Sequence, residues 1–121
     1  MSFIMVALFL GSFTVTSYRA VPEQTRPTGY TWTASGERVN VHGVAVSQDM
    51  LKRNGGTLQF GDTVFIEGIG VKFINDTMHG RHKKQFDVLV QTYGDEKAFD
   101  KRFRGKKLKV WILRVPKGVL K

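Results

Sequence analysis

Two aspartates, Asp76 and Asp87, stand near the two ends of the stretch INDTMHGRHKKQFDVLV, residues 74–90, and His79 and His82 lie between them. Paired carboxyl groups can perform acid–base chemistry, because different surroundings let one hold a proton while the other stays charged. Two histidines and an aspartate could also bind zinc. However, this His-x-x-His lies in a Gly-containing segment with three cationic side chains, which favours a substrate-contacting loop. A catalytic acid with a supporting partner and a charged turn, in which Asp76 only forms the turn, are the two remaining interpretations of this stretch. No metal or cofactor is expected.

The position of Asp87 follows from strand periodicity. Along residues 85–90, Phe86, Val88 and Val90 alternate with Gln85, Asp87 and Leu89. Side chains of a β-strand point alternately to opposite faces, so the apolar set belongs in the core. Asp87 is then expected to point outward from the middle of a rigid strand.

Short runs rich in β-branched and aromatic residues alternate with turn signals throughout the chain. This pattern predicts an all-β domain, a small barrel or sandwich. The expected strands cover residues 13–20, 44–46, 63–68, 71–75, 86–91 and 108–115. One or two short helices are also expected, over residues 48–53 and after Thr92, where Asp95 can complete a capping box and Gly105 can end the helix.

The 121 residues correspond to one domain without cysteine. An apolar run, residues 3–10, precedes it, and at eight residues it is too short to cross a bilayer, which needs about 20. We divide the chain into an apolar segment, 1–12, and a barrel domain, 13–121. A retained strand, an anchor and a degenerate signal remain open for the first segment.

The net charge of +9 resides at the C-terminal end. Residues 97–121 hold ten Lys or Arg and one acid, whereas the first 96 residues hold nine of each sign. Such a distribution is typical of proteins that face a polyanion or an anionic surface, although it also suits a merely solvated face. Nucleic acid is the less favoured partner, because Phe99 and Phe103 are expected to face the core.

Several motifs occur in a characteristic order: VTSYRA, TASGERV, GVAVS, FGDTVFIEG, INDT and FDVLV, followed by a helix and KLKVWIL. This order resembles the 3D domain, named for three aspartates, of the lytic transglycosylase A, resuscitation-promoting and stationary-phase survival proteins, with members among phage proteins. The resemblance covers about residues 15–115. It implies a six-stranded double-psi β-barrel.

The resemblance also assigns roles to residues. The second family aspartate falls on Asp76 and the third, the catalytic acid, on Asp87. The first position holds Ser47, with Asp49 two residues later, which is a departure from the family pattern. Residues 78–84 replace the Gly-rich segment that the family has between its second and third aspartates. The predicted substrate-binding residues are Thr16, Tyr18, Ser35, Gly36, Thr77, His79 and His82, with turn formation as the alternative for Ser35 and Gly36.

The activity implied by the resemblance is lytic transglycosylation of peptidoglycan, the cleavage of N-acetylmuramic acid–N-acetylglucosamine bonds with a 1,6-anhydro product. The partners would be glycan strands and a second protein or copy that completes the groove, and the location a cell envelope, the periplasm or a phage particle. The chief alternative is a non-catalytic wall-binding or virion structural module that kept the barrel. Nucleic-acid binding through the basic end ranks third.

Overall fold

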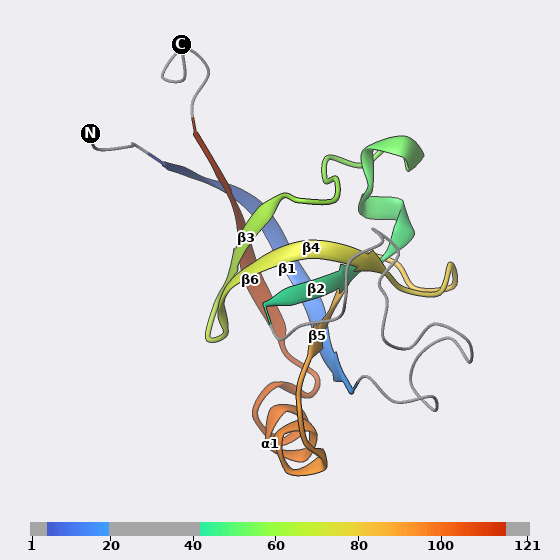
Figure 1. The fold of residues 1–121 in the computed structure, drawn as a ribbon, viewed down its shortest axis with the longest axis vertical. Coiled ribbons are helices and arrows are strands. Elements are labelled where there is room, and N and C mark those ends of the chain that lie inside the picture. Colours follow the sequence, from blue (N-terminus) through green and yellow to red (C-terminus); the bar gives the residue numbers. More distant parts are fainter. Residues whose placement is uncertain (1–4, 20–41, 116–121) are drawn as a thin grey trace.

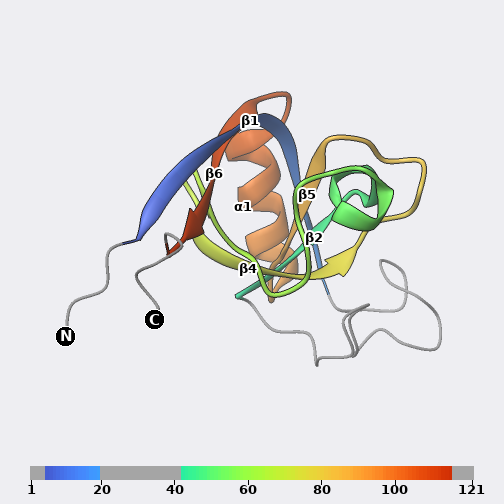
Figure 2. The same cartoon turned by 90° about the horizontal axis from the view of Figure 1, so that it is seen from above.

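Six strands close into a barrel. The computed structural model describes residues 5–19 and 42–115. Around the barrel the strands follow the order β1-β5-β2-β4-β3-β6 (Figures 1 and 2). Their bounds are β1 Val6–Tyr18, β2 Gly43–Val46, β3 Thr63–Ile66, β4 Gly70–Thr77, β5 Gln85–Leu89 and β6 Lys107–Arg114. The predicted all-β, six-stranded barrel is thus confirmed, and each expected strand is present.

Strands β1 and β5 are parallel, as are β2 and β4, and the other four pairs are antiparallel. A parallel pair cannot be joined by a tight hairpin, so residues distant in sequence become neighbours. The segment containing Asp87 therefore lies between β1 and β2 rather than beside the strand that precedes it in the chain.

Strand β1 includes much of the apolar N-terminal run. It pairs with β6 from Val6, opposite Arg114, and continues without a break past residue 12. A bulge interrupts the pairing between Phe9 and Gly11, and Gly11 has φ +145°, a conformation that favours glycine. Residues 6–12 therefore form part of the barrel wall.

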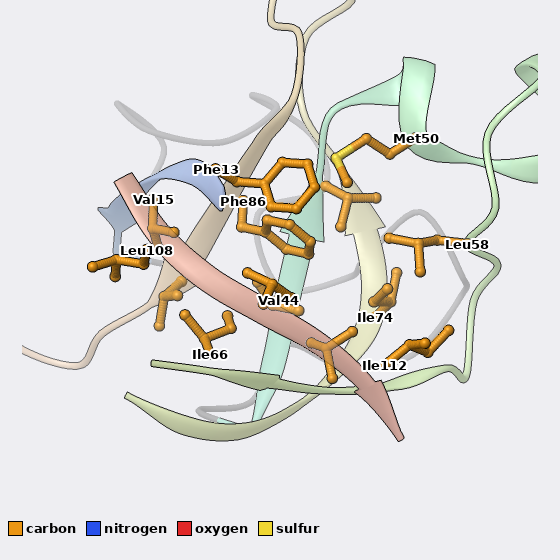
Figure 3. Packing of buried hydrophobic residues seen from close by; sticks show 14 of the residues in the cluster. Phe13, Val15, Val44, Met50, Leu58, Ile66, Ile74, Phe86, Leu108 and Ile112 are labelled. Carbon is orange, nitrogen blue, oxygen red and sulfur yellow. The ribbon is translucent and has the colours of Figure 1, made fainter. Parts of the chain in front are cut away.

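The interior of the barrel is filled by apolar side chains from all six strands (Figure 3). Val44, Ile66, Ile74, Phe86 and Val110 are fully buried. The rings of Phe13 and Phe86 meet edge to face, with centroids 5.3 Å apart. Since each such side chain contributes roughly 1.5–3 kcal/mol on burial, this core holds the strands rigidly in register.

Helix α1 (Tyr93–Phe103) lies at one end of the barrel (Figure 1). Its N-cap is Thr92, whose hydroxyl accepts the Asp95 N–H while the Asp95 carboxylate accepts the Thr92 N–H, the capping box expected from the sequence. Phe103 is buried and Phe99 packs against it, with ring centroids 4.8 Å apart. Both rings face the core as predicted.

The short helix expected over residues 48–53 is present as two 3-10 turns, η1 (Gln48–Met50) and η2 (Lys52–Asn54). Leu51 between them is extended. Ser47 does not cap η1 with its side chain, because its hydroxyl oxygen instead accepts the Gln85 N–H at 3.0 Å. The Ser47 side chain thus joins this segment to the distant strand β5.

Candidate active site

The polar side chains expected at the site form one row across four neighbouring strands. Thr16 on β1 lies in register with Asp87 on β5, Asp87 with Ala45 on β2, and Ala45 with Asp76 on β4. Residues in register on neighbouring strands share a face of the sheet. We call these four residues the acidic row.

The acidic row faces away from the core. The residues that alternate with its members on β1, β2 and β5 are buried in the interior: Val15, Val44 and Val88. The outward position of Asp87 predicted from periodicity is therefore consistent with the burial of its neighbours. Neighbouring strands are about 4.8 Å apart, so the backbones of Asp76 and Asp87 are separated by roughly 10 Å, within reach of electrostatic coupling.

Asp76 reaches this face through a bulge in β4. Val44 pairs with Ile74, whereas the next residue of β2, Ala45, pairs with Asp76, so that Asn75 is an extra residue. Without the bulge Asp76 would share the inward face of Ile74. The Asn75 side chain is buried over Gly43, where a Cβ would collide with its amide group. Gly43 thus makes room for the residue that turns Asp76 outward.

Asp87 is held by a short chain of hydrogen bonds. The Thr16 hydroxyl donates to Asp87 Oδ1 at 2.8 Å, and Gln85 Nε2 donates to Thr16 Oγ1 at 3.0 Å. Because the Gln85 amide supplies a hydrogen to the Thr16 oxygen, the hydroxyl hydrogen is directed to the carboxyl group. This arrangement fixes Asp87 in one orientation on a rigid strand.

The surroundings of Asp87 favour its protonated form. Its pKa is raised from 3.8 to about 6, above all by burial, which disfavours the charged form. The charges of Asp76 and Glu96 act in the same direction, and the hydrogen bond from Thr16 opposes them. Glu96 lies on α1 and binds Arg19, with 3.4 Å between Arg19 Nε and Glu96 Oε1. An aspartic acid with this pKa can donate a proton under weakly acidic conditions.

A small apolar cluster adjoins the acidic row on the same face. It consists of Tyr18, Ala45, Met78 and Leu89. Burial above all, and then the charges of Asp76 and Asp87, raise the pKa of Tyr18 well above its ordinary value. Its phenol therefore stays neutral and lies within electrostatic reach of both carboxyl groups, as the prediction of Tyr18 at the site requires.

Thr77 supports the site through its backbone rather than its side chain. Its N–H donates to Asp76 Oδ1 at 2.9 Å. Thr77 pairs with the core residue Val46, so its side chain shares the inward face. The Thr77 backbone thus supports Asp76, while the contact of Thr77 with substrate stays a prediction.

The loop that joins β4 and β5 carries both histidines. His79 is exposed and accepts the Arg81 N–H at Nδ1, and His82 is partly exposed. Gln48 Nε2 donates to the Met78 carbonyl and anchors the start of the loop to η1. Contact between these histidines and a substrate stays a prediction, and within residues 5–19 and 42–115 no three His, Asp or Glu side chains gather as a metal site.

The two candidates for the missing first aspartate have structural roles. Ser47 is fully buried, and its oxygen binds the Gln85 N–H. Asp49 accepts the Lys84 N–H at 3.2 Å, and Lys84 has φ +47°, unusual for a residue with a side chain. Partial burial acts to raise the pKa of Asp49, but hydrogen bonds from Ser47 and Lys84 outweigh it and lower the pKa. Both residues thus shape the end of the loop next to β5.

Some of the site was not anticipated. Gln85 shares the outward face with Asp87, so the sequence indicates its position but not its hydrogen bond to Thr16. Glu96 comes from α1, and no local pattern places it beside Asp87. Ser35 and Gly36 lie outside the described residues.

The sequence matches no protein-family model, and no curated protein matches it. None of the helices in the described ranges is long and apolar enough to cross a membrane. Because one barrel architecture can host many functions, the function has to be argued from the acidic row and its surroundings.

Proposed function

We propose that the acidic row is the acid–base site of a peptidoglycan-cleaving domain that acts by lytic transglycosylation, in a cell envelope or a phage particle. One observation carries the proposal: Asp87 has a pKa raised to about 6 while the Thr16 hydroxyl holds it in place. A single carboxyl group that can hold and release a proton suits a reaction in which the substrate supplies its own nucleophile.

The proposed reaction has two proton transfers through Asp87. Protonated Asp87 donates to the glycosidic oxygen, and the bond between C1 of the muramic residue and that oxygen breaks. The C6 hydroxyl of the same muramic residue then attacks C1 and passes its proton to the Asp87 carboxylate. One product ends in a 1,6-anhydro-N-acetylmuramic residue, and the other ends in an N-acetylglucosamine residue with a free hydroxyl. Asp87 is again protonated. No activated water is needed, unlike in most glycosidases.

The neighbours of Asp87 take supporting roles in this scheme. Before the reaction, the charge of Asp76 favours the protonated form of Asp87. In the oxocarbenium-like transition state, the same charge stabilises positive charge on the sugar. The neutral phenol of Tyr18 offers a hydrogen-bond donor on the apolar side of the site. Thr16 and Gln85 orient the acid.

The test is the incubation of the purified chain with purified sacculi, followed by mass spectrometry of the soluble products. Anhydro-muropeptides are expected from the wild type, and their release should fall by at least about a hundredfold in Asp87→Asn, the usual scale of acid–base catalysis. The matched control is Asp100→Asn on α1, which removes a carboxylate from an exposed ion pair with Arg104. This control should release products at the wild-type rate.

Other outcomes would overturn the proposal. Products with reducing muramic ends would indicate hydrolysis by water. Binding to sacculi without any release would favour the wall-binding or structural module. Equal release by the wild type and a folded Asp87→Asn variant would remove Asp87 from the chemistry.

A further inference from the structure

The outer surface of the barrel carries a group of apolar side chains, exposed except for the partly buried Trp111, on the arc formed by β1, β6, β3 and β4. One transverse row runs through Phe9, Trp111, Phe65 and Val71, which lie in register on these four strands. Phe73 lies two residues beyond Val71 on the same outward face and is also exposed. We call these five residues the aromatic face.

Trp111 is the centre of the aromatic face. Its ring lies 5.6 Å from that of Phe9 and 6.0 Å from that of Phe65, centroid to centroid. Phe9 is 60% exposed. Within the described residues, the large exposed hydrophobic side chains all belong to this arc, except Met5 just before β1 and Tyr93 on α1. Such clustering marks an interaction surface, because apolar side chains scattered singly are the norm elsewhere.

The aromatic face is centred on β6 and β3, which contribute no residue to the acidic row, although both groups include residues of β1 and β4. Figure 2 shows β6 on one side of the barrel and β5 and β2 on the other. Asp87 and Ala45 lie on β5 and β2, which contribute no residue to the aromatic face. The proposed chemistry therefore leaves this surface without a role.

A basic band adjoins the aromatic face along the strands. Lys107 and Lys109 precede Trp111 at two-residue intervals on the outward side of β6, both exposed, opposite Thr14 and Ser12 of β1. None of the described strands β1, β3 and β6 contains an acidic residue. Glu67, just after β3, accepts the Lys109 backbone N–H at 3.2 Å.

We propose that the aromatic face and its basic band dock the protein on the surface of an anionic phospholipid membrane. Apolar and aromatic side chains bordered by lysines match both parts of such a surface, the acyl chains and the negative head groups. The charge argues against a second copy, because two chains of net charge +9 repel each other. The outer face of a closed barrel is convex, which suits insertion into a deformable lipid surface.

The first test is co-sedimentation with vesicles of phosphatidylcholine containing about a third phosphatidylglycerol. The wild type should bind them, and added salt should weaken binding because it screens the lysines. The double variant Phe9→Ser/Phe65→Ser should bind about tenfold more weakly, since two partly inserted rings are lost. Tyr93→Ser is the matched control, because Tyr93 is 59% exposed on a different surface, and it should bind like the wild type.

A second pair of variants separates the contribution of charge to vesicle binding from that of the apolar side chains. Lys107→Gln/Lys109→Gln should lower binding to the anionic vesicles by about thirtyfold, at roughly 1 kcal/mol for each lysine, and leave the weak binding to pure phosphatidylcholine unchanged. Lys97→Gln/Lys101→Gln removes the same charge from exposed positions of α1 and should have a much smaller effect. Equal losses in the two pairs would overturn the proposed site.

The fluorescence of Trp111 provides a direct readout in a Trp32→Phe background, since the chain has two tryptophans. Lipids brominated in the acyl chain should quench it. Trp111 that stays unquenched in bound protein would overturn the proposal. So would a wild type that does not bind vesicles but forms dimers that Phe9→Ser/Phe65→Ser dissociates, a result that would assign the surface to self-association. Sacculi assays contain no membrane, so this result and that of the cleavage assay are independent.

Discussion

Asp76 and Asp87 lie on the two strands that flank β2, and both are in register with the same residue, Ala45. A single small side chain therefore separates two carboxyl groups on one face of the barrel. The negative charge of Asp76 is one of the causes that raise the pKa of Asp87 to about 6. This coupling between strands leads to predictions about stability, pH dependence and fold.

The ionisation of Asp87 should destabilise the fold. Its pKa is higher in the folded chain than in the unfolded one, so the stability present below pH 4 is lost as the pH rises through about 6. Asp87→Asn, which can still accept the Thr16 hydrogen bond, should therefore raise the free energy of unfolding by roughly 3 kcal/mol at pH 8 and by less than about 1 kcal/mol at pH 4. Denaturant titrations at both pH values measure the difference, and an equal effect at both would contradict it.

Removal of Asp76 should change the pH dependence of cleavage. If protonated Asp87 is the acid, muropeptide release falls as the pH rises above about 6. Asp76→Asn removes a neighbouring negative charge, so the pKa of Asp87 decreases and the alkaline limb of the profile moves to lower pH. Rates from pH 4.5 to about pH 8 locate the limb. A limb that stays in place would show that Asp76 does not act on Asp87.

Loss of the Thr16 hydroxyl should move the alkaline limb of the pH profile of cleavage to higher pH. The hydrogen bond from Thr16 stabilises the Asp87 carboxylate and lowers its pKa, so Thr16→Val should raise it. Gln85→Leu should produce a smaller shift of the same sign, because it leaves the hydroxyl present but without its donor. Thr14→Val, an exposed position on β1 two residues earlier, serves as the control. Identical profiles for all three variants would contradict the proposed hydrogen-bond chain.

The bulge in β4 should be necessary for the site. In Gly43→Ala the new methyl group collides with the buried Asn75 amide, so we expect a loss of about 1–3 kcal/mol in stability and of most activity. Gly80→Ala is the matched control, because a Cβ there meets only the end of the Gln48 side chain near 4 Å. Thermal unfolding and muropeptide release measure both effects. Should Gly43→Ala match Gly80→Ala, the bulge has no part in placing Asp76.

Local patterning was sufficient for the strands, the capped helix and the direction of Asp87. These features depend on residues two to four positions apart, such as Phe86 and Val88 in β5 or Thr92 and Asp95 at α1. The helix expected after Ser47 forms as two 3-10 turns. The bond from the Gln85 N–H to the Ser47 hydroxyl joins residues distant in sequence, so no local pattern indicates it.

Tertiary structure alone decided the rest of the site. Asp76 faces outward because Asn75 is bulged over Gly43, and an alternating pattern cannot register an extra residue. Asp87 holds its proton to about pH 6 because chain closure buries it and brings Asp76 and Glu96 near. The aromatic face likewise exists only because β1, β6, β3 and β4 pair in register. A strand specifies which way its side chains point, but which side chains then meet depends on the closure of the barrel.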